Sequence, residues 1–308
     1  MIRWTPADIP SQAGKRALVT GANSGIGFHA ARHLARAGCA VLLGCRDISR
    51  AEEARRLILQ DSPSALVEIV LLDLASLKSI HAAGELLLTR GAPLDLLINN
   101  AGVMALPARQ TTEDGFERQF GINHLGHFAL TGLLMPLVLA APAGRIVTVS
   151  SIAHKDGRMR FEDLQYASGY KPWLSYRQSK LANLLFGFQL ERRLERADAR
   201  AISVMVHPGL AATRILANGP GTSRGVVSTF GPIFMSLLAQ SDEQGSYPTL
   251  YGATSGAALG GHYYGPDGMF EFWGVPVEVK AKPWATDPAA AALLWEVSEK
   301  LTGVHYTI

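Results

Sequence analysis

This chain of 308 residues contains little cysteine and no pattern of metal ligands. Its two cysteines, Cys39 and Cys45, flank an apolar segment that reads as a strand. A strand rises about 3.3 Å per residue, so the two residues lie roughly 20 Å apart and cannot form a disulfide with each other. His124 and His127 lack a third ligand nearby in the sequence. The sequence therefore predicts neither a disulfide between the two cysteines nor a metal site.

Charge of one sign and long apolar runs are also scarce. Charged residues make up 18% of the chain, and basic residues are mixed with acidic ones to a net charge of +3, which argues against a nucleic-acid partner. No continuous apolar run reaches the ~18 residues of a membrane span, and residues 1–15 lack the apolar segment of a signal peptide. We therefore expect a cytoplasmic protein without a membrane span. Its 48% of hydrophobic residues predicts a large core.

Glycine, by contrast, is clustered where a phosphate group could bind. Residues 17–27 read ALVTGANSGIG, in which an apolar strand leads into glycines that also begin a helix. Gly21 allows a sharp turn, Gly25 keeps side-chain atoms away from a pyrophosphate, and Gly27 lets a helix over residues 28–37 pack against the sheet. The N–H groups at the start of that helix would face the phosphates. An ordinary glycine-rich turn is the alternative, but the apolar strand after the helix favours a dinucleotide site.

Apolar strands and helical stretches alternate along most of the chain. The predicted strands are residues 16–20, 40–43, 67–72, 94–99, 145–150 and 201–207. Such alternation indicates an α/β protein with a Rossmann fold, a doubly wound parallel sheet with helices on both faces. We expect residues 1–308 to form a single NAD(P)-binding domain. Within it, residues 210–245 would form a substrate lid, and residues 260–308 an extension that packs against the core.

Tyr176 and Lys180 are four residues apart at the start of a helix predicted over residues 176–194, so their side chains share one face. A tyrosine hydroxyl, with a pKa of about 10, is a poor acid or base at neutral pH, and a nearby ammonium group lowers that pKa. A surface pair is the default interpretation of this spacing. The motifs that surround it in the sequence favour a catalytic pair.

Those motifs follow the predicted strands in order. They are Asn99-Asn100-Ala101-Gly102, Asn123, Ser150-Ser151 and Pro208-Gly209. With the glycine turn and the Tyr176 and Lys180 pair, they make the chain resemble the short-chain dehydrogenase/reductase family from about Lys15 to Thr213.

The resemblance implies a catalytic role for four residues. Tyr176 would be the acid/base, and Lys180 would lower its pKa and hold the nicotinamide ribose. Ser151 would orient the substrate oxygen, with Ser150 as the alternative serine. Asn123 would support a water relay.

The 24 residues between Ser151 and Tyr176 form a longer gap than in the commonest family members. The ends of the gap, SSIAHKDG and YRQSKLAN, resemble the retinol-dehydrogenase branch and its bacterial relatives. The tail segments EQGSYPTLYGAT, GGHYYGPDG and LLWEVSEKLTG point to the same branch. The charged residues within the gap could alternatively solvate a surface loop.

The end of the second strand bears on the choice of cofactor. NAD sites place a carboxylate there, whereas an arginine accommodates the 2′-phosphate of NADP. Arg46 occupies this place, so NADP(H) is favoured over NAD(H), although a shift of one residue would bring Asp47 toward the ribose. Asp73 resembles the residue that contacts adenine, or alternatively caps the following helix. Asn99 is expected to tie the sheet together.

The other residues of the motifs are expected to lie along the cofactor. The full cofactor set comprises Gly21, Asn23, Ser24, Gly25, Ile26, Gly27, Arg46, Asp73, Leu74, Asn100, Ala101, Gly102, Tyr176, Lys180, Pro208, Gly209 and Thr213.

An apolar stretch from Val226 to Leu238 lies where the family builds its lid, and Met104, Tyr170, Trp173 and Leu210 could line the opening. We therefore expect a bulky, apolar aldehyde, ketone or alcohol as substrate. A binding protein that senses NADP(H) without catalysis is the alternative, and a sugar-nucleotide epimerase or dehydratase ranks below both. The assembly stays open. Family members often pair as homodimers or homotetramers through the helices that hold Asn123 and Tyr176, but the long tail could block that contact.

Overall fold

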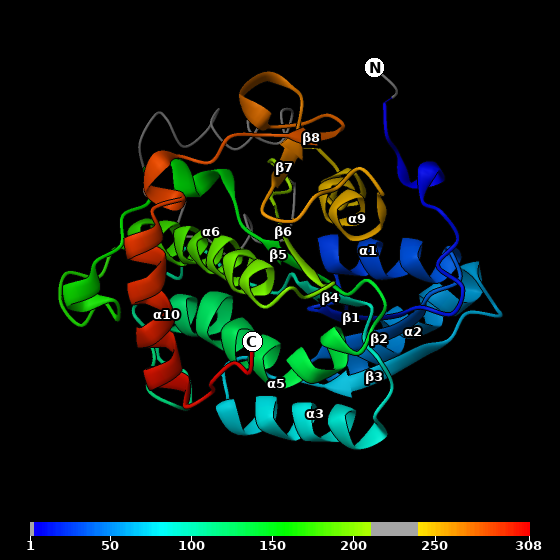
Figure 1. Cartoon of the computed structure of the whole chain (residues 1–308), viewed down its shortest axis with the longest axis horizontal. Coiled ribbons are helices and arrows are strands. Elements are labelled where there is room, and N and C mark those ends of the chain that lie inside the picture. The colour runs from blue at the N-terminus through cyan, green and yellow to red at the C-terminus, as the bar shows by residue number, and fades with distance from the viewer. Residues whose placement is uncertain (1–2, 211–239) are drawn as a thin grey trace.

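The computed structural model describes residues 3–210 and 240–308, which build an eight-stranded sheet with helices on both faces (Figure 1). The strand order is β3-β2-β1-β4-β5-β6-β7-β8. Neighbouring strands are parallel from β3 to β7, and β8 is antiparallel to β7. The strands are β1 (Arg16–Thr20), β2 (Ala40–Cys45), β3 (Val67–Leu71), β4 (Leu96–Asn99), β5 (Arg145–Val149), β6 (Ile202–Val206), β7 (Tyr263–Pro266) and β8 (Pro276–Glu278). The predicted doubly wound α/β fold is confirmed.

Helices lie on both faces because alternate strand residues point to opposite sides. Leu18 packs in the core under α3, α5 and α6, whereas Val19 packs in the core under α1, α2 and α9. The α-helices are α1 (Gly25–Arg36), α2 (Ile48–Asp61), α3 (Leu77–Arg90), α4 (Arg118–Phe120), α5 (Gly126–Leu139), α6 (Pro172–Arg196), α8 (Asp242–Gly245), α9 (Tyr247–Thr254) and α10 (Pro288–Thr302). The short 3₁₀ and π helices are η1 (Pro6–Asp8), η2 (Gly121–Leu125), η3 (Ile152–Asp156), η4 (Phe161–Asp163), η5 (Met269–Glu271) and η6 (Pro283–Ala285).

Two helices begin earlier than the sequence predicts. Helix α1 starts at Gly25 rather than at residue 28, because the glycines themselves form its first turn. Helix α6 starts at Pro172 rather than at Tyr176, since proline is well accommodated at the first position of a helix. Tyr176 therefore lies more than one turn inside α6.

The tail does more than pack against the core. Its first part extends the sheet, because β7 pairs with β6 and β8 pairs with β7. Its last helix, α10, packs against α5 and α6. Trp295 of α10 is 1% exposed, and its ring stacks 5.8 Å from that of Phe186 in α6. The hydroxyl of Tyr306 donates a 2.7 Å hydrogen bond to the carbonyl of Phe128 in α5.

One helical stretch, Arg118–Leu139, is long and apolar enough to cross a membrane by length and composition. In this fold 83% of its most apolar window is buried. It includes α4, η2 and α5, which lie under the sheet and carry His124 and His127.

The buried histidines make the fold sensitive to acid. Burial lowers the pKa of His124 to about 3 and that of His127 to about 4, whereas the ordinary pKa of a solvated histidine is 6.5. The unfolded chain therefore takes up protons first as the pH falls below 6.5, and stability falls with it. We expect the free energy of unfolding, measured in urea, to drop by about 2 kcal/mol per histidine between pH 7 and pH 5.

The matched variant is His124→Phe, because the imidazole already packs against Phe120 at 5.2 Å between ring centroids. This variant should lose less stability than the wild type over the same pH interval. An equal loss in both proteins would contradict the assignment.

Candidate active site

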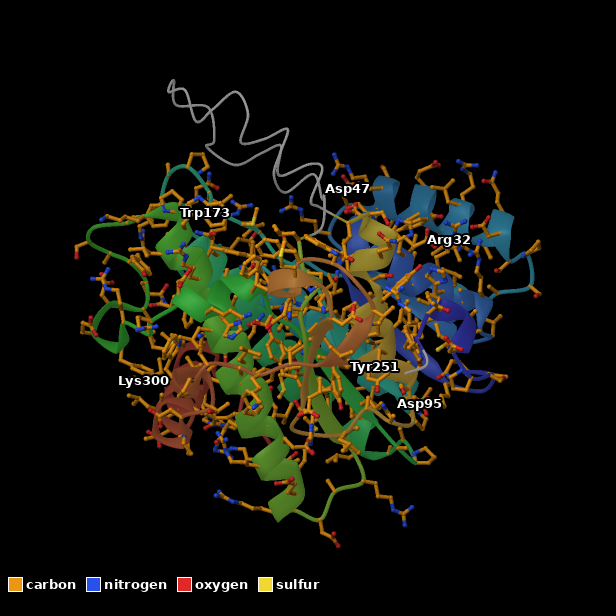
Figure 2. The ribbon with its side chains drawn as sticks, turned by 90° about the horizontal axis from the view of Figure 1, so that it is seen from above. Arg32, Asp47, Asp95, Trp173, Tyr251 and Lys300 are labelled. Atoms are coloured by element: carbon orange, nitrogen blue, oxygen red, sulfur yellow. The ribbon has the colours of Figure 1, made fainter. Side chains whose placement is uncertain are left out.

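A cavity of about 790 Å³ opens at the carboxyl ends of the central strands. Asp47, which follows β2, lies at one edge of the molecule with Trp173, whereas Asp95, which precedes β4, lies toward the opposite edge (Figure 2). Of the residues expected along the cofactor, those that line the cavity are Gly21, Asn23, Ser24, Gly25, Ile26, Gly27, Arg46, Asp73, Leu74, Asn100, Ala101, Gly102, Tyr176, Lys180 and Pro208. Gly209 lies beside this lining, and Thr213 and the stretch Val226 to Leu238 fall outside the described residues.

The turn between β1 and α1 is built for close approach of a ligand to the backbone. Gly21 and Gly25 have φ values of +66° and +57°, a region that favours glycine. A Cβ at Gly27 would overlap the Asn100 side chain and the Gly21 carbonyl. Ser24, at the N-cap of α1, makes no side-chain cap. The first N–H groups of α1 are therefore free to meet an anion, so the turn fits a dinucleotide pyrophosphate.

Thr20, at the end of β1, holds the loop that follows β4. Its hydroxyl accepts hydrogen bonds from the backbone N–H groups of Asn100 at 2.9 Å and Ala101 at 3.0 Å. The Asn100 amide also donates to the Thr20 carbonyl at 2.9 Å. Asn99 turns the other way and donates to Thr131 Oγ1, so its side chain links β4 to α5.

The charged side chains that follow β2 and β3 differ in their hydrogen-bond partners and in their exposure. Asp47 caps α2 by accepting from the Arg50 N–H at 3.0 Å, and its carboxylate also lies 3.7 Å from the Arg50 guanidinium. Arg46 is exposed and lines the cavity. Asp73 accepts from the Ala75 N–H at 2.9 Å, and Ser76 rather than Asp73 caps α3.

Tyr176 and Lys180 are buried side by side on α6. Lys180 Nζ donates to the Val149 carbonyl at 3.1 Å, and burial lowers the pKa of this ammonium group to about 8. Burial raises the pKa of the Tyr176 hydroxyl, and a hydrogen bond with Ser151 partly offsets this. That Lys180 lowers the pKa of Tyr176 stays a prediction, and in this structure its ammonium group donates to a carbonyl of β5.

The two serines after β5 have different partners. Ser150 lines the cavity, but its hydroxyl donates to the Lys180 carbonyl at 2.7 Å. Ser151 is the serine that lowers the pKa of Tyr176, and its hydroxyl accepts from the Ala153 N–H at 3.1 Å.

Asn123 is fully buried in η2, where the helix widens to a single π turn. Its side chain accepts from the Val103 N–H at 2.8 Å and donates to Ser179 Oγ at 2.9 Å. Its carbonyl lies 3.0 Å from His127 Nδ1, and His127 Nε2 lies 2.9 Å from Thr20 Oγ1. A Cβ on Gly102 would lie 3.1 Å from Asn123 and 3.5 Å from Lys180, so this loop passes close to both.

Several cavity residues escaped the sequence analysis. Arg50, in the first turn of α2 and four residues after Arg46, also lines the cavity. Asp242 also lines it, with one buried carboxylate oxygen that has no partner among the described residues. No sequence signal connects Asp242 with the glycine turn, because the sheet topology alone brings α8 against α1.

A comparison with protein families matches residues 15–220 to the short chain dehydrogenase model. The chain belongs to the short-chain dehydrogenase/reductase family. It is 40% identical to human retinol dehydrogenase 13 over 96% of this chain and 88% of that protein. It is 37% identical to mouse polyprenol dehydrogenase over 97% of this chain and 87% of that one.

A crystal structure of an uncharacterised protein from Mycobacterium paratuberculosis has the same fold, with a TM-score of 0.82 and 39% identity over 99% of this chain and all of that one. Within the family, the chain falls in the retinol-dehydrogenase-like branch. This short-chain dehydrogenase is an oxidoreductase that acts on CH–OH or C=O groups. Among residues 3–210 and 240–308, no group of three metal-ligating side chains occurs.

We expect the burial of Lys180 to lower the free energy of unfolding of this short-chain dehydrogenase. Its pKa falls from 10.5 to about 8 on folding, so the charged form is disfavoured. Lys180→Met should raise the free energy of unfolding without cofactor by up to about 3 kcal/mol at pH 7. The Val149 carbonyl keeps a partner in this variant, because Asn183 also donates to it at 3.1 Å.

The advantage of the variant should shrink above pH 8. The wild-type lysine then loses its proton in the folded state while the unfolded chain still binds one, so wild-type stability rises. Chemical denaturation at pH 7 and pH 9 measures both values. A variant less stable than the wild type at pH 7 would contradict the inference.

Proposed function

We propose that this protein is an NADP(H)-dependent oxidoreductase that interconverts an apolar aldehyde or ketone and its alcohol. The observation that carries the proposal is the convergence of Tyr176, Ser151 and Lys180 beside a cavity whose other end is a glycine turn with free helix N–H groups. The membership of the chain in the family supports the reaction type.

The residues would share the work of carbonyl reduction. When bound, the nicotinamide cofactor supplies the hydride that joins the carbonyl carbon. Ser151 donates a hydrogen bond to the carbonyl oxygen, and Tyr176 gives its proton to the same oxygen as charge develops there. Lys180 stays protonated below about pH 8 and would favour the tyrosinate that remains. Asn123 would hold the path by which a proton returns to Tyr176.

The preference for NADP(H) rests on two guanidinium groups. Arg46 and Arg50 both line the cavity beyond β2, and a guanidinium group matches a phosphate with two parallel hydrogen bonds. Asp47, which in the alternative would accept from the ribose hydroxyls of NAD(H), already caps α2 and pairs with Arg50.

The apolar character of the substrate rests on the side chains near Tyr176. Trp173 is 46% exposed, and its ring lies edge-on to that of Tyr176 at 6.0 Å. Met104 lines the cavity. Relatives named for retinol and polyprenol, both long apolar alcohols, support the same class of substrate.

The assembly that we propose avoids the helices expected to pair. α10 packs against α5 and α6, with Trp295 and Tyr306 buried among their side chains. A homodimer or homotetramer would therefore use another face. A cytoplasmic location is supported by the two cysteines, which are free and buried, as suits a reducing compartment.

The experiment that tests the function is loss of NADPH absorbance with carbonyl compounds graded by size and polarity, all-trans-retinal among them. We expect turnover with the bulky apolar members. Tight NADPH binding without turnover of any compound would favour the alternative, an NADP(H)-sensing binding protein. The matched variant Tyr176→Phe should lose at least about 100-fold in kcat because it lacks the acid, while its Kd for NADPH stays close to wild type.

Arg46→Ala tests the choice of cofactor. The variant should bind NADPH about 10- to 100-fold more weakly, because charged hydrogen bonds to the 2′-phosphate are lost, while NADH binding changes little. Fluorescence titration with both cofactors measures the ratio. Arg56→Ala is the control, since Arg56 lies on α2, the helix that follows Arg46, but pairs with exposed Glu53 at 2.6 Å. An unchanged ratio in the Arg46 variant would count against NADP(H).

A further inference from the structure

A cluster of charged and buried polar groups lies next to the site. Three segments that are far apart in the sequence meet there, namely η3, the end of β6 and η5. Glu271 of η5 places one carboxylate oxygen 2.7 Å from Lys155 Nζ and the other 3.1 Å from His207 Nε2. Lys155 belongs to η3, which begins directly after Ser151. His207 follows β6 and precedes Pro208 and Gly209. One carboxylate therefore links the segments on both sides of the catalytic residues.

The contact with His207 determines which ring nitrogen carries the proton. His207 is fully buried, and Nδ1 accepts a hydrogen bond from the Gly209 N–H at 3.2 Å. An accepting Nδ1 leaves the proton on Nε2, which faces Glu271. The approach of His207 Nε2 to Glu271 is close but not aligned as a hydrogen bond, and neither atom has a hydrogen-bond partner among the described residues. A carboxylate 3.1 Å from Nε2 favours a proton on that nitrogen, and therefore favours the tautomer whose Nδ1 can accept from the Gly209 N–H.

The contact with Lys155 acts on the other side of the site. η3 is anchored at Ser151, whose carbonyl accepts from the N–H of His154 at 3.1 Å and from its Nδ1 at 2.7 Å. Lys155 is the next residue after His154, and its ion pair with Glu271 fixes the outer side of this turn. This turn therefore determines the backbone position of Ser151, the serine that lowers the pKa of Tyr176.

The backbone at Glu271 is itself unusual. Phe270 and Glu271 have φ values of +55° and +62°, in the left-handed region that non-glycine residues seldom adopt. The side chain of Phe270 is 70% exposed, so burial of its ring does not account for this conformation. Strained residues of this kind persist where surrounding contacts hold them, and they gather at functional sites. The two contacts of the carboxylate are such a constraint.

We propose that Glu271 is a positioning residue that sets both walls of the active site, through His207 for the Pro208 and Gly209 turn and through Lys155 for the turn that carries Ser151. This proposal rests on the proposed function for its effect on turnover. Its effect on the His207 tautomer is independent of that function. The pKa of Glu271 is held at about 2 by His207 and Lys155 against the effect of burial, so the carboxylate is ionised at neutral pH.

Glu271→Gln gives the sharpest test, because the amide has only one accepting atom. The Lys155 ammonium can only donate, so it takes the amide oxygen and leaves the NH₂ group facing His207 Nε2. The proton of His207 then moves to Nδ1. There it points at the Gly209 N–H, and the hydrogen bond between the two groups is lost. We expect a fall in kcat of at least about tenfold with the apolar carbonyl substrate and a several-fold weaker Kd for NADPH. Heteronuclear NMR of the imidazole nitrogens should show the tautomer change.

Two further variants complete the design. Lys155→Met should lower kcat while leaving the Kd for NADPH and the His207 tautomer as in the wild type, since only the Ser151 side is released. Glu278→Gln is the matched control, because Glu278 also pairs with a histidine of the tail, His262 at 3.1 Å, but is 63% exposed on β8. It should match the wild type in every measurement.

The outcomes separate the proposals. Wild-type kinetics and an unchanged tautomer in Glu271→Gln would overturn the positioning role. If that variant fails to fold, Lys155→Met decides, and an unchanged kcat would overturn it. If the wild-type protein reduces no carbonyl compound, the proposed function fails, while the NADPH affinity and the His207 tautomer in Glu271→Gln still decide the inference about Glu271.

Discussion

The hydrogen bonds of the Thr20 hydroxyl hold together the segments at the end of the cavity where we propose that the cofactor binds. It accepts from two consecutive N–H groups of the loop after β4 and contacts His127 of α5. His127 in turn lies against the carbonyl of Asn123. The glycine turn, the Asn-Asn-Ala-Gly loop and the π turn that carries Asn123 are therefore held by one buried side chain. A hydroxyl suits this position, because it can donate one hydrogen bond while it accepts others.

At the end of the cavity that holds Tyr176 and Lys180, burial has the largest effect on the pKa values of the ionisable groups. Tyr176 and Lys180 both lie inside the fold, and burial disfavours the charged form of each. A dinucleotide in the cavity would bring polar groups and negative charge beside them. In the protein alone, Lys180 donates to the Val149 carbonyl of β5, and Ser151, two residues after β5, lowers the pKa of Tyr176.

Much of this arrangement could be predicted from the sequence because it depends on local rules. Apolar runs located the six strands β1 to β6, and glycines and polar residues at strand ends marked the lining of the cavity. Contacts between distant segments could not be predicted in this way. Nothing local connects Glu271 with Lys155 and His207, or α10 with α6, since the register of β7 and the path of the tail decide both. The helix starts at Gly25 and Pro172 were missed because residues that usually interrupt helices are accepted in a first turn.

α10 packs on α6 but is synthesised after it, so the packing around α6 is completed late in synthesis. α6 carries Tyr176 and Lys180, yet the aromatic side chains that cover its outer face, Trp295 and Tyr306, come much later in the chain. During synthesis, the central strands can pair as they emerge from the ribosome, but α6 keeps an uncovered apolar face until those residues follow. The helix that carries Tyr176 and Lys180 therefore reaches its full packing only after Trp295 and Tyr306 have been synthesised.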